Sequence, residues 1–556
     1  MEYYRAFATM GITPDLYIKK YAIPLVGIGL LFPILITLIL GDLTPPPVKT
    51  VLYLIPVALT LLIVMYPITF LESRKRQIDD SIHYYVTELG VLSTARMSRK
   101  DLMGKVSENE AYGFLAEETA KIHMLMDKWN LSFARACQFI AQRTPSWLFA
   151  DFLGRFAHAV QAGEDVETFL RSEQKVVMND FDTMYRDSLH SIDMITELFV
   201  SLMMSLIFIV SFAIILPVII GMDSTLLMLG SLLIFAVSEV ALVYFAKLRV
   251  PKDRIWHTLD IETRADRAIK RTFPISIIAC GVVGVVVFVA GIFPTNVMIA
   301  MMITPLIITG RVASREEEKI KRKDDNFAAF IRSLGATAGA RGGMVNESLR
   351  ELTEHDFGPL SEEIRALYKR LATRVNKVRS WEYFAAGTGS NLIERFGTIF
   401  AEGTHIGGKP EVIGEIIGDN FMHITSLRKL RYSSSRSLVG TLYGLTAGIA
   451  FTLFLSVVIM DMLTRVFTSA EIPAGMDIGL SLDTAESINM EMINLFVILM
   501  MLIHAALSSI LIRIVDGGHI FNTYTHFVGL TWTSVICAEM TVRLVTPMIS
   551  AGGGWG

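Results

Sequence analysis

Long apolar runs without charge alternate with two polar stretches along this 556-residue chain. A helix needs roughly 20 mostly apolar residues to cross the hydrocarbon core of a bilayer, so each run near that length predicts a membrane span. Nine runs qualify, at residues 23–40, 51–71, 198–221, 226–246, 273–293, 296–310, 438–460, 490–512 and 527–549. A hydrophobic content of 52% and a mean hydropathy of +0.48 exclude an ordinary soluble protein. We therefore predict an all-α integral membrane protein with about nine transmembrane helices.

The first and sixth runs each allow a second interpretation. Lys19 and Lys20 precede the first run, as in a signal peptide, but no small-residue cleavage site follows and a second apolar run comes soon after. This pattern favours a membrane span. The sixth run is short and contains Pro305, so we expect it to pair with the fifth as a tight hairpin around Pro294.

The distribution of positive charge predicts the orientation of the chain, because Lys and Arg are enriched in the cytoplasmic segments of membrane proteins. If the N-terminus is cytoplasmic, the inside segments hold 48 of the 51 Lys and Arg residues. We expect a multi-pass protein of the cell membrane with its N-terminus in the cytoplasm and its C-terminus outside.

The spans and polar stretches divide the chain into five parts, of which the two large polar ones are predicted to be cytoplasmic helical domains. The parts are 1–71 with two spans, 72–197 as the first domain, 198–310 with four spans and a basic loop at 247–272, 311–437 as the second domain, and 438–556 with three spans and an outer loop at 461–489. The outer loop carries five acidic residues and one basic residue, Arg465. It is either simply solvated or contacts a partner outside the cell.

The two polar stretches look like copies of one unit, which indicates an internal duplication. A shift of 245 residues aligns Ile82, Tyr85, Val86 and Leu89 with Phe327, Phe330, Ile331 and Leu334. Both sets have the i, i+3, i+4, i+7 spacing of a buried helix face. After a slip of one residue, Leu148, Phe152, Phe156, Ala157 and Gly163 align with Leu392, Phe396, Phe400, Ala401 and Gly407. Each copy is therefore predicted to be a helical bundle of roughly 120 residues.

Two strings in the sequence resemble motifs of enzymes. Residues 403–410 fit the GxxxxGK frame of a phosphate-binding loop, but Pro410 stands where a Ser or Thr must bind magnesium, so we interpret them as a helix break. Residues 516–519 (DGGH) resemble a metal-ligand segment of intramembrane proteases, but no HExxH motif accompanies them, so we interpret them as a tight turn. Three cysteines without a CxxC pair indicate neither disulfides nor zinc. We expect no enzyme activity, no metal and no cofactor.

Four polar residues lie within the predicted spans, where a charge at the bilayer centre costs about 2.5–3.5 kcal/mol. Glu539 and Arg543 are four residues apart and are expected to form an ion pair on one helix face. Glu239 lies near the inner end of its helix, where we expect it to reach water, and His504 is the fourth residue. We hypothesise that Glu239, Glu539 and Arg543 contact transmembrane segments of a partner. The four groups are too few for the proton relay of a transporter.

The basic loop at 247–272 has two possible roles. The first is that of a helix that lies along the inner membrane surface and binds anionic lipid, at about 1 kcal/mol per positive charge. The alternative is that the loop docks an acidic partner.

The duplicated domain carries Leu-Gly, Ala-Arg and FGPLSEE patterns and resembles the type II secretion F family, which includes the platform proteins of bacterial type IV pili. The residues that carry this resemblance are Gly90, Arg96 and Gly113 in the first copy and Gly335, Arg341 and Gly358 in the second. Nine spans, an inward N-terminus, hairpins inserted between the copies and a long acidic outer loop are similar to the archaeal branch that serves the archaellum. The first copy departs from the pattern, with Tyr-Gly-Phe at 112–114 where the second has Phe-Gly-Pro.

The resemblance implies a membrane platform at the base of a motility filament, which in archaella also turns the filament. It implies as partners a cytoplasmic hexameric secretion-type ATPase, pilin or archaellin subunits, membrane lipids and a second copy of the chain in a homodimer, and no nucleic acid. An adhesive type IV pilus, a related secretion machine and a transporter are the alternatives. We hypothesise that exposed basic residues contact the ATPase, namely Arg96, Arg99, Lys100, Arg341, Arg315 and Lys319.

Overall fold

The computed structural model of the chain describes residues 2–40, 46–220, 224–469 and 490–552. Within these residues the regular elements are helices, and the only β-type pairing is an isolated bridge between Trp256 and Ser390. The predicted all-α fold is confirmed. Most of the acidic outer loop, residues 470–489, lies outside the described residues.

Six helices in the described part of the chain are long and apolar enough to cross a membrane, and a bent pair of helices raises the number to seven. Seven of the nine predicted spans fall within them, and the chain is a multi-pass membrane protein. The six are α10 (Val166–Ile220), α11 (Ser224–Arg249), α12 (Arg264–Ala290), α19 (Pro410–Ser469), α21 (Met490–Asp516) and α22 (Thr523–Gly552), and the bent pair is α13 (Thr295–Ile303) with α14 (Leu306–Ala340).

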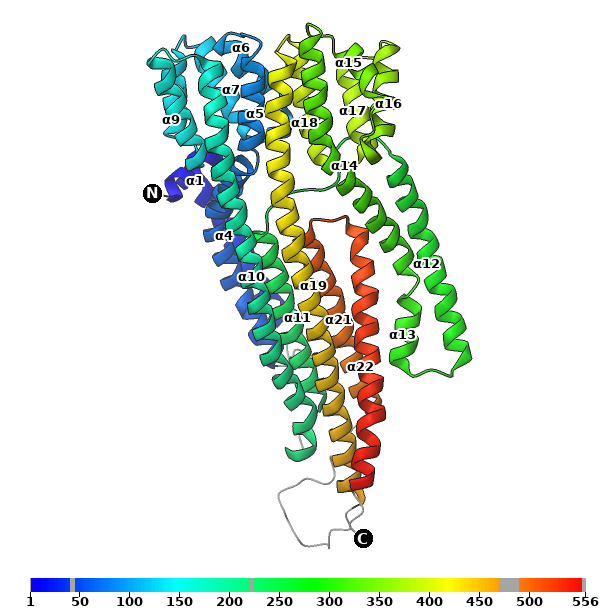
Figure 1. The fold of residues 1–556 in the computed structure, drawn as a ribbon. Coiled ribbons are helices and arrows are strands. Elements are labelled where there is room, and N and C mark those ends of the chain that lie inside the picture. The colour runs from blue at the N-terminus through cyan, green and yellow to red at the C-terminus, as the bar shows by residue number, and fades with distance from the viewer. Residues whose placement is uncertain (1, 41–45, 221–223, 470–489, 553–556) are drawn as a thin grey trace. The chain divides into compact units, whose positions relative to one another are not determined.

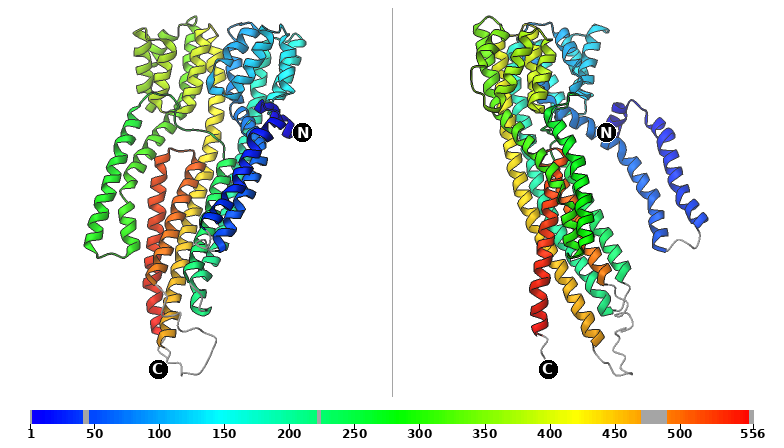
Figure 2. Two further views of the ribbon diagram at one scale, coloured as in Figure 1. Left: turned by 180° about the vertical axis from the view of Figure 1, so that it is seen from behind. Right: turned by 90° about the vertical axis from the view of Figure 1, so that its right-hand side faces the viewer.

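The other two predicted spans fall in α3 (Ile23–Leu40) and α4 (Pro46–Asp79), which are helical as expected. The right-hand view of Figure 2 shows these two helices, in dark blue, lying beside each other. Many of their side chains are outside the described residues, so their crossing of the membrane stays a prediction.

The hairpin predicted around Pro294 is confirmed. Helix α12 is followed by Gly291, which adopts the left-handed backbone conformation (φ 59°) that favours glycine, and Pro294 caps α13. Proline has no backbone N–H and clashes with the preceding turn, and the chain bends by 42° where Pro305 separates α13 from α14. The hydroxyls of Ser276 and Thr309 then meet at 2.7 Å across α12 and α14.

The basic loop at 247–272 was interpreted as a helix along the inner membrane surface, and for residues 250–263 this interpretation is wrong. Helix α11 stops before Pro251, and α12 starts only after Thr263, whose side chain and Asp266 form a capping box. The linker between them is extended, because its backbone bonds to other chain segments: the amide of His257 donates to the carbonyl of Gly389 at 2.9 Å.

The chain divides into two compact units, the first of which contains residues 1–181 and 402–416. Its core includes the fully buried aromatic side chains of Tyr85, Phe149, Phe152 and Phe156. Besides α3 and α4, its helices are α1 (Glu2–Met10), α2 (Pro14–Tyr17), the π-helical turn η1 (Ile18–Ala22), α5 (Ile82–Ser93), α6 (Arg99–Ser107), η3 (Glu110–Tyr112), α7 (Phe114–Asp127), α8 (Phe133–Ala141), α9 (Trp147–Gln161) and the start of α10.

The second unit contains residues 182–401 and 417–556. It includes the membrane helices named above, except for the first turns of α10 and α19. Helices α21 and α22 pack as a hairpin joined by η5 (Ile520–Asn522), and α11 packs against α21 (Figure 1). The polar end of the unit is a bundle of α14, α15 (Val345–Leu352), η4 (Gly358–Leu360), α16 (Ser361–Ala372), α17 (Lys377–Thr388) and α18 (Asn391–His405). Phe327, Phe330, Phe384 and Phe396 fill its core.

The order of elements repeats as the duplication predicts. Helices α9 and α18 begin and end at positions separated by the same 244 residues that separate the starts of α10 and α19. Phe152 and Phe156 have their counterparts in Phe396 and Phe400, and all four are fully buried.

In each bundle an aspartate lies against a serine: Asp79 is the last residue of α4, just before α5, and Asp324 lies within α14. The Ser146 hydroxyl donates to the Asp79 carboxylate, and Asp324 lies beside Ser390. Each serine also accepts a hydrogen bond from the backbone amide three residues later, at the start of α9 or α18. In each bundle the aspartate and serine therefore fix the start of α9 or of α18 at the equivalent position.

The string that resembles a phosphate-binding loop is the turn between α18 and α19, as interpreted from Pro410. Gly407 has φ 94°, a conformation that favours glycine. Gly403 and Gly408 pack closely against α5 in the first unit, where an added Cβ at Gly403 would lie 2.3 Å from Val91 Cγ1.

Replacing Gly403 by alanine should destabilise the first unit. The new methyl group would overlap Val91 and approach Ile413 Cδ1 at 3.1 Å, and overpacking of this kind costs roughly 1–3 kcal/mol. We expect a lower midpoint of thermal unfolding for the full chain in detergent.

Gly154→Ala is the matched control, because Gly154 lies inside α9 with nothing within 4 Å of an added Cβ. Alanine favours helix more than glycine, so this variant should unfold at or above the wild-type midpoint. Equal midpoints for the two variants would contradict the close packing of Gly403.

Candidate functional site

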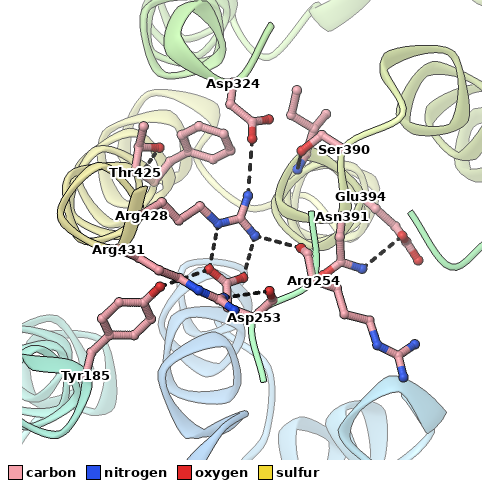
Figure 3. Close-up of polar contacts among 12 residues, drawn as sticks. Tyr185, Asp253, Arg254, Asp324, Ser390, Asn391, Glu394, Thr425, Arg428 and Arg431 are labelled. Atoms are coloured by element: carbon pink, nitrogen blue, oxygen red, sulfur yellow. Dashed lines mark hydrogen bonds and ion pairs between the residues drawn. The ribbon is translucent and has the colours of Figure 1, made fainter. Parts of the chain in front are cut away.

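A buried polar cluster in the second unit joins the membrane helices to the helical bundle, and we call it the junction. At its centre Arg428 of α19 forms a two-pronged ion pair with Asp253 of the 250–263 linker, with Nε 2.7 Å from Oδ2 and Nη2 2.5 Å from Oδ1 (Figure 3). Its Nη1 lies 3.2 Å from Oδ2 of Asp324 on α14. Only 3% of the Arg428 side chain is exposed, so the two carboxylates supply the countercharge that water cannot.

Arg431, one turn further along α19, binds backbone carbonyls. Its Nε donates to Val515 O at 2.6 Å and its Nη2 to Ile514 O at 3.1 Å, both in the last turn of α21, while Nη1 donates to Asp253 O at 3.0 Å. Carbonyls at the end of a helix have no partner within it, and a cation there also interacts favourably with the helix dipole. The phenol of Tyr185 on α10 completes the junction by donating to Asp253 at 3.4 Å.

Glu317 of α14 ties the turn between α21 and α22 to the same region. Its carboxylate accepts hydrogen bonds from the Asn522 side chain at 3.0 Å, from Trp256 Nε1 at 3.3 Å and from the backbone N–H of His519. The DGGH string is thus a turn, as interpreted. Gly517 has φ 76°, and a Cβ on Gly518 would lie 2.8 Å from Glu317.

The junction balances its charges in a buried setting. Arg428 and Arg431 face Asp253 and Asp324, and each guanidinium reaches a different set of elements. Through these contacts α10, the linker, α14, α19 and α21 are held together where the membrane helices end.

A second polar cluster is buried among the membrane helices. Glu239 of α11 bonds to His504 Nδ1 on α21, and His504 Nε2 lies 3.1 Å from the Thr446 hydroxyl of α19. Both Glu239 and His504 are completely buried, so the prediction that Glu239 reaches water is wrong. The sequence placed Glu239 near a helix end, but the neighbouring helices cover it.

The predicted pair of Glu539 and Arg543 is confirmed, with 3.6 Å between its closest atoms. Glu539 also accepts a hydrogen bond from the Asn296 amide at 3.1 Å. The Arg543 side chain is 81% exposed, which leaves it open to other contacts.

The basic residues predicted to meet the ATPase lie at bundle turns and on α14. Arg96 follows α5 with φ 53°, and Arg99 and Lys100 begin α6, where Lys100 pairs with Asp127. Arg341 follows α14, whose last part is equivalent to α5, and its Nη2 lies 2.6 Å from Glu351 Oε2. Arg315 and Lys319 are exposed further back on α14. The equivalent residues Arg96 and Arg341 therefore occupy the same turn of their bundles.

A carboxyl group is buried in the first unit without full compensation. Glu88 of α5 accepts hydrogen bonds at Oε2 from Tyr112 and Asn109, while its Oε1 has no hydrogen-bond partner. Burial raises the pKa of Glu88 to about 7, repulsion from Glu402 adds to this, and the two hydrogen bonds oppose it.

The junction residues Asp253, Asp324, Arg428 and Arg431 were not identified from the sequence, although one signal was available. The Asp324–Asp325 pair aligns with Asp79–Asp80 at the same 245-residue shift that relates the two bundles. No comparable pattern marks Arg428 or Arg431, since basic residues next to a span are usual. In the described residues the three cysteines are unpaired, and no group of three or more His, Cys, Asp or Glu side chains is placed to hold a metal ion.

Comparison with known proteins gives two kinds of match. Residues 85–214 match the family model of the type II secretion system (T2SS), protein F. The chain is 35% identical over 551 residues to the Flagella accessory protein J of Methanocaldococcus jannaschii, covering 97% of each, and 35% identical over 553 residues to that of Methanococcus voltae, covering 98% of each. No solved structure matches the chain.

Replacing Arg428 by methionine should strongly destabilise the second unit. The change leaves the carboxylates of Asp253 and Asp324 buried without their cation, and breaking a buried pair in this way costs about 3–5 kcal/mol. We expect a lower thermal midpoint and faster trypsin cleavage in the 250–263 linker, which carries Lys252 and Arg254.

The adjacent Lys429→Met is the matched control. Lys429 pairs with Asp325 at 2.8 Å, but the two side chains are 64% and 47% exposed, so its loss should cost less than about 1 kcal/mol. Similar effects of the two substitutions would show that the junction does not hold the unit together.

The stability of the first unit should fall as the pH rises from about 4.5 to about 7. Because the folded pKa of Glu88 lies above its ordinary value of 4.5, the folded chain binds more protons in this window than the unfolded chain. The contribution is fully present below the window and lost above it, and it amounts to something on the order of 3 kcal/mol.

Glu88→Gln should remove this decline, so that the variant gains stability relative to the wild type at pH 8. The exposed Glu110→Gln serves as the control, and thermal midpoints of the three proteins between pH 4 and 8 are the measurement. Parallel pH profiles for Glu88→Gln and the wild type would rule out a buried, protonated Glu88.

Proposed function

The chain belongs to the Flagella accessory protein J family, a branch of the type II secretion F family, and from this membership we propose how it works as a membrane platform of the archaellum. We propose that it couples a cytoplasmic hexameric secretion-type ATPase to assembly and rotation of the filament. The observation that carries this proposal is the junction, where a buried arginine joins the helical bundle to the membrane helices.

The proposed coupling is mechanical. Helices α10 and α19 are continuous over 55 and 60 residues, so at 1.5 Å per residue each is roughly 80–90 Å long (Figure 1). Each runs from a bundle turn into a membrane span without a loop that would absorb motion. A displacement of the bundle would therefore reach the membrane end of α19, and Arg428 and Arg431 would pass it to α14 and α21.

The orientation follows from charge. With an N-terminus in the cytoplasm, 48 of the 51 Lys and Arg residues lie on the inner side. This orientation places both helical bundles in the cytoplasm, where ATP is available, and the acidic 461–489 loop and the C-terminus outside. The proposed domain boundaries are those given by the spans, at 72–197 and 311–437.

The energy would come from the ATPase and not from the chain. The two strings that resemble a phosphate-binding loop and a protease metal segment both form turns whose glycines are needed for close packing. We therefore propose a scaffold without catalysis, cofactor or bound nucleic acid. It would act as a homodimer, and its exposed Arg543 beside Glu539 would contact transmembrane segments of archaellin subunits.

The proposed ATPase contact is the turn that follows the opening helix of each bundle. Arg96 and Arg341 occupy this turn in the two copies, and Arg96, Arg99 and Lys100 are exposed. Positive charge there suits an acidic surface on the partner, which would raise the rate and specificity of association.

Reversing both charges, in Arg96→Glu/Arg341→Glu, should weaken binding of the cognate secretion ATPase about tenfold or more. The reason is that two attractive contacts become repulsive. The measurement is ATPase binding to the full chain in lipid nanodiscs, together with stimulation of ATP hydrolysis.

Arg143→Glu is the control for Arg96→Glu alone, because each reverses one exposed charge of the first bundle. Arg143 lies in the turn before Ser146, which contacts Asp79 at the end of α4, whereas Arg96 follows the end of α5. Unchanged ATPase binding by the double variant would contradict the proposed contact. An equal loss of ATPase binding in Arg143→Glu and Arg96→Glu would mean that general surface charge attracts the ATPase.

A further inference from the structure

A cavity of about 410 Å³ opens in the second unit between α14, α19, α21 and α22, and we call it the boundary pocket. Its lining residues lie near one end of four apolar runs. They include Lys321 on α14, Arg436 and Val439 on α19, and Ile512 and Arg513 on α21. The predicted spans at 438–460 and 490–512 begin and end at these same positions. The pocket therefore lies where hydrocarbon gives way to water.

The carboxylates of the boundary pocket already have partners. Glu317 accepts the three hydrogen bonds of the α21–α22 turn. Glu318 pairs with Arg322 at 3.3 Å, and Asp516 lies 3.8 Å from Lys321. These acids are thus not free to neutralise the remaining cations of the pocket.

Two arginines in the boundary pocket lack a countercharge. Neither Arg436 nor Arg513 forms an ion pair with any residue that the structure describes. The Nε of Arg513 is shielded from solvent and has no acceptor, and the Thr523 hydroxyl and Nδ1 of His526 beside it also have no partner. A buried charged donor without an acceptor is costly, so the pocket is built for an anion that is missing from the protein itself.

The chemistry of the pocket selects a phosphate. A guanidinium offers paired N–H donors that match phosphate oxygens, and two of them, on α19 and α21, line this pocket. The volume of about 410 Å³ exceeds what a lone phosphate fills and lies in the range of small-molecule sites. Val439 and Ile512 supply an apolar edge on the membrane side.

We propose that the boundary pocket binds the head group of an anionic phospholipid, with Arg436 and Arg513 as its phosphate ligands. Basic pockets between membrane helices recognise anionic lipid heads in this way. The bound phosphate would bridge α19 to α21 one to two turns from Arg431, which joins the same two helices through carbonyl groups. The lipid would thus extend the junction to the membrane surface. The inference does not depend on the proposed ATPase contact.

The test measures binding of phosphatidylglycerol to the full chain in detergent, by native mass spectrometry and by the shift of the thermal midpoint. Diacylglycerol with the same acyl chains and inorganic phosphate are the two comparison probes. We expect phosphatidylglycerol to bind and to stabilise the wild type, with little effect of diacylglycerol or of inorganic phosphate at the same concentration.

Arg436→Gln and Arg436→Gln/Arg513→Gln should weaken phosphatidylglycerol binding, the double variant about tenfold or more. Arg436 is exposed and has no ion-pair partner in the described chain, so its single variant should fold normally. Arg311→Gln removes an exposed charge from the start of α14, outside the pocket, and should bind like the wild type.

Three results would overturn the proposal. Equal phosphatidylglycerol binding by the wild type and the double variant would show that the lipid does not bind in the pocket. The pocket would then bind another ligand, such as an acidic segment of a partner protein. An equal effect of inorganic phosphate would assign the site to free phosphate. Equal loss in Arg311→Gln would mean that general surface charge attracts the lipid.

Discussion

The structure of the second unit depends on the need to neutralise a guanidinium that water does not reach. Arg428 is 3% exposed, and an unpaired charge in such a place would cost several kcal/mol. The carboxylates that neutralise it come from an extended linker and from another helix. Because Asp253 lies in the linker, this extended chain must reach α19 on its way from α11 to α12, and α14 must present Asp324 toward α19. The buried guanidinium of Arg428 thus constrains the positions of the linker, α14 and α19.

The two bundles share a frame but differ where it meets the membrane helices. Both place an aspartate, Asp79 at the end of α4 or Asp324 in α14, against a serine that caps a later helix. Only the second bundle adds Arg428 and Asp253 to this aspartate. In the first bundle the residue aligned with Arg428 by the 244-residue shift is Met184, an uncharged side chain. The arginine that stands in place of this methionine makes Asp324 of the second bundle part of a larger network.

The sequence predicted those features that depend on local pattern. Apolar runs predicted the membrane helices, and Pro305, Gly407 and Gly517 predicted breaks, because backbone restrictions act within a few residues. Features that depend on partners distant in the chain were missed or wrong. The charges at 247–272 suggested a surface helix, since the sequence does not reveal that Asp253 meets Arg428, 175 residues away. Glu239 was expected to reach water, because the helices that bury it are also remote in sequence.

The short segment 402–416 belongs to the first unit although it lies within the second repeat. Its glycines fit against Val91 and Thr94, and Lys409 and Glu415 pair with Glu167 and Arg171. The two repeats are therefore not interchangeable modules, because one is completed by a piece of the other. The surfaces of α5 and of this segment therefore depend on each other. A substitution in one repeat limits those that the other can accept, so the two copies are constrained together in sequence.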